Sequence, residues 1–435
     1  VICTASISNK YLTVDESLYI VSGYSYLKML DFRVNTAHPV FANMLYGVPL
    51  LLLNPKLPIE SKNWKMIANK IDMGANYGFA ADFYKENLEM FRTIIFSARL
   101  VAIALAVVLG LLIFFWSREA FGSKASLLAL FLYCFEPNII AHSRLATFDI
   151  PLTLFVFASF YFAWKFARSA KVRFLILSSL CISFAVLTKY VALLFFPLLF
   201  LFILLQHKEL SKNRMKFFEK RSLLYYAFIF SILIIVPIVL ANALYALECY
   251  KQNQYVFVPA RMFEGFNFIR SWVEGGREGY LFGEFRTYIP EYFLVAFIIK
   301  TTLAFLVILA ISFYLFIKRP QLELFSILMP ALLFFTIFSL FVRFYLGLRY
   351  ILPAFPFLFV FVSGVFASRL ESITKNRMLS VLLCALLAWH AFASLTIYPH
   401  YLAYFNELIG GPANGPKYLT DSNIDWGQDF FYFME

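Results

Sequence analysis

Charged residues are scarce in this chain of 435 residues: Asp, Glu, Lys and Arg together make up 15% of it, whereas 61% is hydrophobic. The mean hydropathy is +0.74. An ordinary soluble domain carries about 25% charged residues, so this composition excludes a water-soluble globular protein. The sequence therefore predicts an all-α polytopic membrane protein.

Histidine is also rare, with five residues in the whole chain. The histidines show no spacing typical of a zinc site, and we predict no structural metal. The net charge of +12 would suggest nucleic acid in a soluble domain. Here the basic residues separate apolar runs, which is how membrane topology is encoded, so we expect no nucleic-acid partner.

Ten apolar runs are candidates for membrane spans, since a spanning helix needs about 20 apolar residues. The chain enters a polar stretch almost directly after Val1, and we therefore expect a further span to precede it. The ten runs cover residues 93–116, 124–141, 150–167, 172–188, 190–205, 222–245, 292–317, 322–342, 346–367 and 378–397.

Lysine and arginine occupy every second connection between these runs, which places those connections in the cytoplasm. The basic groups are Arg118 with Lys124, Arg168 to Arg173, Lys208 to Arg221, Lys318 with Arg319, and Arg369 to Arg377. The remaining connections then share the outer side.

This topology predicts three regions. Residues 1–91 form a first extracytoplasmic loop, residues 92–397 form the transmembrane bundle with an outer loop at 246–290, and residues 398–435 begin a C-terminal extracytoplasmic segment that we expect to be truncated. Within the first loop, Val40 to Leu53 is apolar but contains Pro49 and is too short to cross a bilayer. We predict a helix lying in the membrane interface there.

Two adjacent carboxylates, Asp15 and Glu16, open the first loop. On an extended segment they would point in opposite directions, so that one could act as a base towards a hydroxyl while the other holds the loop or the acceptor. The alternative is a solvated pair at the start of a helix, where acidic residues are favoured.

Further ionisable residues lie at or slightly inside the outer ends of the spans. Such groups are costly in a membrane and usually line a cavity, although a lysine can also extend its ammonium group to the surface. Together they predict a cationic cavity at headgroup depth that faces the acidic pair. The residues are Glu136, His142, Arg144, Asp149, Lys189, Lys300 and Arg349, the last followed by Tyr350.

A cationic cavity at this depth suits a lipid phosphate. If a sugar is carried on a polyprenyl phosphate, the departing phosphate needs cationic stabilisation, and the acceptor hydroxyl needs a base. One base and a phosphate clamp predict a single displacement with inversion at the anomeric carbon.

Several short motifs together resemble the protein O-mannosyltransferase superfamily of GT-C glycosyltransferases. The motifs are Asp15-Glu16, His38-Pro39, Ser143-Arg144 followed by Asp149, Leu187-Thr188-Lys189-Tyr190, Lys300-Thr301-Thr302 and Gly347-Leu348-Arg349-Tyr350 before Pro353. The tail from Tyr404 to Asp429 resembles a prokaryotic branch of this superfamily. The resemblance implies a GT-C fold and a prokaryotic plasma-membrane location.

The resemblance also implies roles for single residues. Asp15 would be the base, Glu16 its partner, and Asp149 would line the same cavity. The donor phosphate would be bound by Arg144, Lys300, Arg349, Tyr350, Lys189 and His38, and a weaker acceptor contact would come from Asp425, Trp426 and Gln428. Members of this superfamily tend to carry a lysine shortly after the His-Pro step, where this chain has Asn43, so Lys300, Lys189 or Arg349 would carry more of the phosphate binding.

The predicted function is that of a mannosyltransferase-like membrane enzyme that transfers a sugar from a polyprenyl-phosphate donor, at the outer face, to a hydroxyl of a protein, lipid or glycan. The sequence identifies no certain cofactor, and a divalent cation held by Asp15 and Asp149 is an open alternative. The sugar, the acceptor and the oligomeric state are not specified by the sequence.

A transporter or flippase of lipid-linked sugars is the second interpretation, because inset charges also fit a transport path. Transporters usually show internal repeats, and we find none in this sequence. A non-catalytic scaffold would leave the inset charges unexplained.

Overall fold

A computed structural model describes residues 1–7, 10–67, 71–210, 223–252, 259–369 and 376–430. Most of the predicted basic connections at 208–221 and 369–377 lie outside the described residues. The described part is overwhelmingly helical, and its one sheet is a short antiparallel hairpin of β1 (Gly279–Leu281) and β2 (Glu284–Arg286). The all-α prediction is confirmed.

Every predicted apolar run coincides with a helix, a helix preceded by a short 3-10 turn, or a bent pair of helices. By length and composition, five helices of the described chain can cross a membrane, or up to seven if each bent pair is one span. The five are α6 (Phe91–Phe121), α9 (Asp149–Ser169), α12 (Leu223–Gln252), α16 (Leu322–Phe341) and α19 (Arg377–Thr396). Shorter apolar helices are α10 (Val172–Val186), α11 (Phe195–Leu210), preceded by η2 (Tyr190–Leu194), and α17 (Ala354–Ala367), preceded by η3 (Leu348–Ile351).

Two of the predicted spans are bent rather than continuous. Helices α7 (Ser123–Cys134) and α8 (Pro137–Ser143) meet at 67°, and α14 (Tyr292–Lys300) and α15 (Leu303–Lys318) meet at 115°. Pro137 occupies the first turn of α8, where proline starts a helix. At the second bend Thr301 is extended, and the Thr302 side chain caps α15 by accepting the N–H of Phe305.

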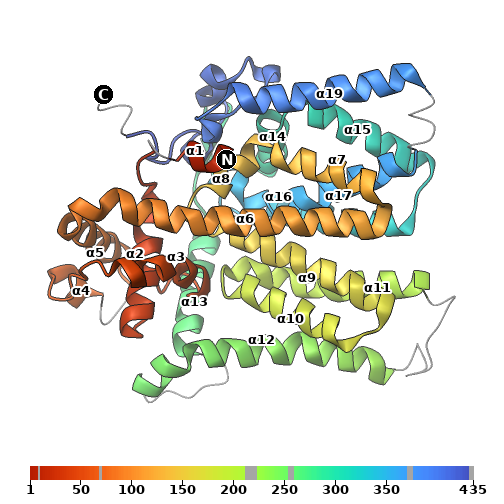
Figure 1. The fold of residues 1–435 in the computed structure, drawn as a ribbon. Helices are drawn as coiled ribbons and strands as arrows, with labels where there is room; N and C mark the ends of the chain where they lie inside the picture. The colour runs from red at the N-terminus through yellow and green to blue at the C-terminus, as the bar shows by residue number, and fades with distance from the viewer. Residues whose placement is uncertain (8–9, 68–70, 211–222, 253–258, 370–375, 431–435) are drawn as a thin grey trace.

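The long helices run side by side in alternating directions, and the remaining elements gather at one end of the bundle (Figure 1). That end holds the segment after α19 together with α1 (Ile2–Ala5), α2 (Val14–Met29), α3 (Phe41–Leu53), α4 (Lys62–Met66), α5 (Met73–Glu86) and α13 (Ala260–Gly275). The turns from α6 to α7, α9 to α10 and α15 to α16 lie at the opposite end. The predicted outer segments thus share one end, and its exposure outside the cell stays a prediction.

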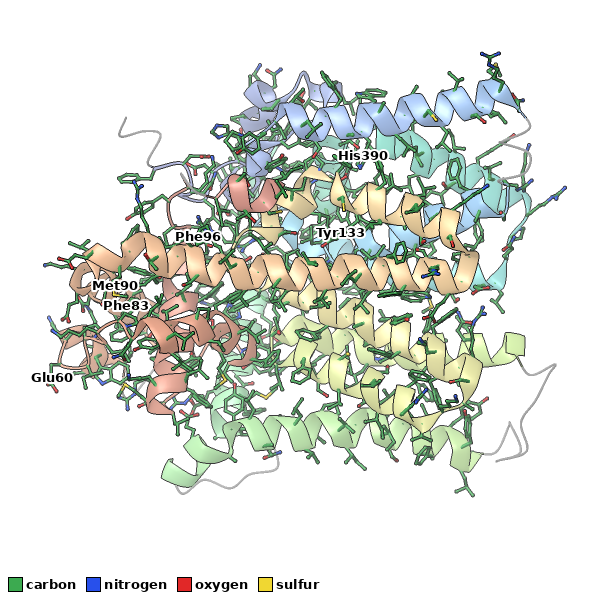
Figure 2. All side chains as sticks on the ribbon, in the orientation of Figure 1. Glu60, Phe83, Met90, Phe96, Tyr133 and His390 are labelled. Atoms are coloured by element: carbon green, nitrogen blue, oxygen red, sulfur yellow. The ribbon has the colours of Figure 1, made fainter. Side chains whose placement is uncertain are left out.

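The described part of residues 10–91 packs around a second hydrophobic core, separate from the main core of the bundle, to which α6, α12 and the turn before α9 also contribute. The prediction of a polar loop with one interfacial helix was too simple, although the apolar helix itself is present as α3. Phe79 and Phe83 of α5 are fully buried in this second core, with Met90 packed against it (Figure 2). Helices α2 and α3 cross with their backbones in contact, because a Cβ atom added to Gly23 would lie 1.7 Å from the carbonyl oxygen of Asn43. The compact α2–α5 unit therefore presents the start of α2 to the bundle as a fixed element.

Candidate active site

Asp15 and Glu16 lie in the first turn of helix α2, so the prediction of an extended segment was wrong. Thr13 caps this helix: its hydroxyl accepts the N–H of Glu16, and the Glu16 carboxylate accepts the N–H of Thr13 at 3.0 Å. The sequence Thr-Val-Asp-Glu is a capping box, which is the signal that would have revealed the helix. Neighbouring residues on a helix point about 100° apart, so the two carboxylates still have different surroundings.

Glu16 is completely buried and forms an ion pair with Arg99 of α6. The guanidinium donates from Nε at 2.9 Å and from Nη2 at 2.7 Å, and the N–H of Ala146 donates to the same carboxylate at 2.8 Å. Arg99 also donates to the carbonyl oxygens of Lys10 and Tyr11. Burial opposes ionisation, but Arg99 and these N–H groups lower the pKa of Glu16. Glu16 thus fixes the start of α2 against α6 and the turn before α9, and it is a positioning residue.

Asp15 is on the accessible side of the same turn, with 17% of its side chain exposed. Each of its oxygens accepts a tyrosine hydroxyl, from Tyr19 at 3.2 Å and from Tyr77 of α5 at 3.3 Å. Arg349 of η3 donates to it from Nη1 at 3.2 Å. No local pattern indicates Tyr77, because it is 62 residues away from Asp15 in the chain.

Asp149 begins α9 and faces the same space. Its carboxylate accepts the hydroxyl of Thr147 at 3.0 Å, and its oxygens lie 3.6 Å from Lys189 Nζ and 4.0 Å from Arg349 Nη1. The Nδ1 atom of His142 is 3.9 Å away. Arg349 therefore has Asp15 and Asp149 as neighbours on two sides. We call Asp15, Asp149, Lys189 and Arg349 the charge cluster.

The two cations of the charge cluster are held by aromatic rings. Lys189 Nζ lies 4.2 Å from the centre of the Tyr350 ring, and the Arg349 guanidinium lies 3.9 Å from the Trp426 ring. Gly347 makes the turn that delivers Arg349, with a φ of +104° that disfavours any side chain. Burial lowers the pKa of Lys189, and the neighbouring Asp149 acts against this shift.

His38 is a half-buried neutral ring beside the charge cluster. Burial, together with the charges of Lys189 and Arg349, lowers its pKa to about 3. Its ring packs edge-on against Phe148 at 4.9 Å, and its Nδ1 makes no hydrogen bond within the described residues. His38 can therefore offer a hydrogen bond to a ligand but no positive charge.

Arg144, which was predicted to bind the donor phosphate, contacts the backbone instead. Its Nη1 donates to the carbonyl oxygens of Ser6 at 3.0 Å and Pro399 at 2.8 Å, and the guanidinium lies over the Tyr401 ring. Among the described residues, no hydrogen bond or ion pair joins it to the charge cluster. Arg144 connects the N-terminal and C-terminal segments.

Lys300 has a similar structural environment at the bend between α14 and α15. Its ammonium group is buried and donates to three carbonyl oxygens, those of Leu402 at 2.9 Å, Tyr404 at 3.1 Å and Asn423 at 2.5 Å. These contacts use all three of its donors. Lys300 thus holds the C-terminal segment, and no hydrogen bond to the charge cluster is present in the described chain.

The predicted acceptor residues lie in a strap, residues 425–429, that crosses the start of α2. The Trp426 carbonyl accepts the N–H of Val14 at 3.0 Å, and the Gln428 carbonyl accepts the N–H of Tyr11 at 2.8 Å. Trp426 also carries Arg349 on its ring. Gln428 is buried and accepts the N–H of Trp426, whereas Asp425 is exposed. Only Trp426 of these three touches the charge cluster.

The charge cluster does not fit a divalent cation. Asp15 and Asp149, the two expected ligands, both have Arg349 as an immediate neighbour, and Lys189 accompanies Asp149. No group of three or more His, Cys, Asp or Glu side chains within the described ranges could hold a metal ion. A metal would have to displace two positive charges that already neutralise these carboxylates.

Comparison with solved structures defines the class of protein: the chain has the GT-C fold. It superposes on ArnT from Cupriavidus metallidurans bound to undecaprenyl phosphate with a TM-score of 0.59 and 15% identity, covering 92% of this chain and 69% of that one. The apo state of the same ArnT gives a TM-score of 0.56 and 16% identity, covering 93% and 66%. An archaeal oligosaccharyltransferase, AglB from Archaeoglobus fulgidus, gives 0.46 and 13% identity, covering 97% and 55%.

Sequence comparison adds a partial match. Residues 85–240 match the family described as dolichyl-phosphate-mannose-protein mannosyltransferase. This range contains Arg99, Asp149 and Lys189. No curated protein matches the chain. The GT-C fold that the resemblance implied is confirmed.

Proposed function

We propose that the protein is a membrane glycosyltransferase that transfers a sugar from a polyprenyl-phosphate carrier to a hydroxyl group of a protein, lipid or glycan. The observation that carries this proposal is the charge cluster, in which one partly exposed carboxylate and two cations meet at one end of a membrane bundle. The undecaprenyl phosphate in the ArnT structure supports the same carrier chemistry here.

Asp15 is the base in this proposal. It is 17% exposed, whereas Asp149 is 1% exposed and faces Lys189 as well as Arg349. A base must reach the proton that it removes, and this favours the more accessible carboxylate. Asp149 then serves to hold the two cations.

Lys189 and Arg349 form the phosphate clamp. The bond between the anomeric carbon and the carrier phosphate breaks as the acceptor oxygen attacks, and the leaving phosphate gains a negative charge that these cations stabilise. Neutral His38 is placed to contact an uncharged group such as a sugar hydroxyl. With one base and no second carboxylate acting as nucleophile, the displacement proceeds with inversion.

The location follows from the same arguments. The alternating basic connections support a position outside the cytoplasm for the end that carries the charge cluster, and the prokaryotic resemblance supports a plasma-membrane location. The description of the matched family makes a mannosyl carrier the first donor to test.

Transport of lipid-linked sugars is less well supported. Two predicted spans are bent, as in many transporters. At the bend beside Lys300, however, the ammonium group is occupied by backbone carbonyl oxygens of the C-terminal segment. The charge cluster lies at one end of the bundle and not along a path through it.

The decisive experiment uses purified protein in vesicles that contain a radiolabelled mannosyl-phosphate polyprenol. The readout is hydrolysis of this donor, in which water takes the place of the acceptor hydroxyl and polyprenyl phosphate and free sugar are released. Asp15→Asn should lower turnover about 10²- to 10⁴-fold, the usual effect of losing a general base. Glu89→Gln, the same chemical change at an exposed site, is the control and should not alter turnover. Normal turnover by Asp15→Asn would contradict the proposal, and movement of intact donor across the vesicle would support transport.

A further inference from the structure

Arg349 has a position that no other cation of the described chain shares. Its Nη1 is 3.2 Å from Asp15 and 4.0 Å from Asp149, its Nε donates to the Leu346 carbonyl, and its face rests on Trp426. Nη2 makes no hydrogen bond within the described residues. The guanidinium is thus anchored at one edge and on one face, while Nη2 is left to take a second partner.

The charge balance of the cluster shows what that partner would change. Asp15 and Asp149 carry two negative charges, and Lys189 and Arg349 carry two positive charges, so the cluster is neutral before a ligand binds. The two tyrosines that face Asp15, Tyr19 and Tyr77, add hydrogen bonds but no charge at neutral pH. An arriving phosphodiester brings one negative charge and must draw a cation towards itself.

Both cations belong to the proposed clamp, but Arg349 is the one that also pairs with Asp15. Lys189 is held by Asp149 at 3.6 Å and by the Tyr350 ring, whereas Arg349 meets Asp15 through a single nitrogen. A guanidinium also matches a phosphate with two parallel hydrogen bonds, which one N–H to a carboxylate cannot equal.

We propose that Arg349 exchanges partners, pairing with Asp15 before the donor binds and with the donor phosphate afterwards, so that donor binding releases the base. This inference rests on the proposed function. It makes the order of binding obligatory, since Asp15 is engaged until the lipid phosphate is in place.

The exchange also fits the transfer step. The acceptor oxygen forms a bond to the anomeric carbon, the bond from that carbon to the phosphate oxygen breaks with its electron pair leaving on the phosphate, and the acceptor proton moves to Asp15. Asp15 becomes neutral at the moment when the phosphate gains its second negative charge. Arg349 is therefore attracted to the phosphate and not to the neutral Asp15 until the product phosphate leaves.

Chemical modification of Asp15 tests this without any acceptor. A hydrophobic carbodiimide reacts with protonated carboxyl groups, and mass spectrometry of the full-length protein in detergent gives the pH at which half of Asp15 is modified. Undecaprenyl phosphate should raise this midpoint by about one pH unit or more, since a nearby anion replaces a cation as the neighbour of Asp15. Undecaprenol, which lacks the phosphate, should leave it unchanged. Glu60, at the far end of the α2–α5 unit, is the internal reference (Figure 2).

Two variants sharpen the test. Arg349→Gln should raise the midpoint in the absence of lipid, whereas Arg343→Gln, which removes an exposed arginine six residues earlier, should not. If Arg349→Gln does not fold, the parental protein with and without the lipid decides the matter.

The melting temperature separates the two levels of failure, because a bound ligand stabilises the folded state. If undecaprenyl phosphate raises the melting temperature but leaves the Asp15 midpoint unchanged, the partner exchange is overturned and the proposed function survives. If the lipid changes neither quantity, both are overturned.

Discussion

Two pairs of cations lie at the same end of this bundle, and they differ in what they touch. Arg144 and Lys300 donate to backbone carbonyl oxygens at 2.5 to 3.1 Å. Lys189 and Arg349 face carboxylates at 3.2 to 4.0 Å. A carbonyl is part of the fold and cannot leave, whereas a carboxylate can exchange its cation for a phosphate or a proton. We therefore expect the first pair to maintain the structure and propose that the second is available to a ligand.

Arg99 provides the extreme case of an anchoring cation, because it contacts both a carboxylate and two carbonyls. Arg99→Leu should cost about 3–5 kcal/mol, since it leaves the Glu16 charge buried without a partner. The melting temperature in detergent measures this loss. Arg92→Leu, at an exposed position in the same helix, should change stability by less than about 0.5 kcal/mol. Equal melting of both variants would show that Glu16 does not need Arg99.

Lys189→Met should weaken binding of the donor lipid without destabilising the fold. A hydrogen bond to a charged group contributes about 1.5–3 kcal/mol, so undecaprenyl phosphate should bind roughly 10- to 100-fold more weakly. The melting temperature without lipid should stay close to that of the parent. Lys165→Met, a cation near the other end of the bundle, is the matched control for binding. Unaltered lipid affinity in Lys189→Met would remove it from the clamp.

Lys300→Met should show the opposite pattern. Three carbonyls would lose their donor, at a cost of about 1–3 kcal/mol for a buried acceptor left unsatisfied, while lipid affinity per folded molecule stays unchanged. Thermal unfolding and lipid binding are measured on the same preparation. A fall in lipid affinity with normal stability would move Lys300 from the anchoring pair to the clamp.

The smallest effect concerns pH. His38 has a folded-state pKa of about 3 against an ordinary 6.5, so between these values the unfolded chain binds the extra proton. Stability should therefore fall as the pH drops below about 6.5, by about 1.4 kcal/mol per pH unit. Melting temperatures across pH 7 to 5 should decline less steeply in His38→Asn than in the parent. Parallel curves would mean that His38 is not held as a neutral ring.

Much of the fold could be predicted from the sequence, because hydropathy alone marks the helices. The positions of the two bends could not, since they depend on caps and on contacts with distant segments. The helix Val14–Met29 was not predicted, even though Thr13 and Glu16 form a capping box at its start. Two adjacent carboxylates are a more conspicuous pattern than the capping box that contains one of them.

The candidate site was predictable in its members but not in their division of labour. Asp15, Asp149, Lys189 and Arg349 were all selected for charge at an unusual depth, and the structure brings them together. The same criterion selected Arg144 and Lys300, because depth in a membrane does not reveal whether the partner is a carbonyl or a carboxylate. Arg99 lies within an apolar run and pairs with Glu16, which is 83 residues away in the sequence. No local sequence pattern predicts such a pair.

The strap of residues 425–429 is synthesised long after the start of α2, which it contacts. Its carbonyls receive the N–H groups of Tyr11 and Val14, and its tryptophan forms the platform under Arg349. At a synthesis rate of about 5–20 residues per second, the start of α2 waits on the order of 20 to 80 s for these partners to emerge. Asp15 thus leaves the ribosome long before Trp426, so the charge cluster gains its aromatic platform only after residue 426 has been made.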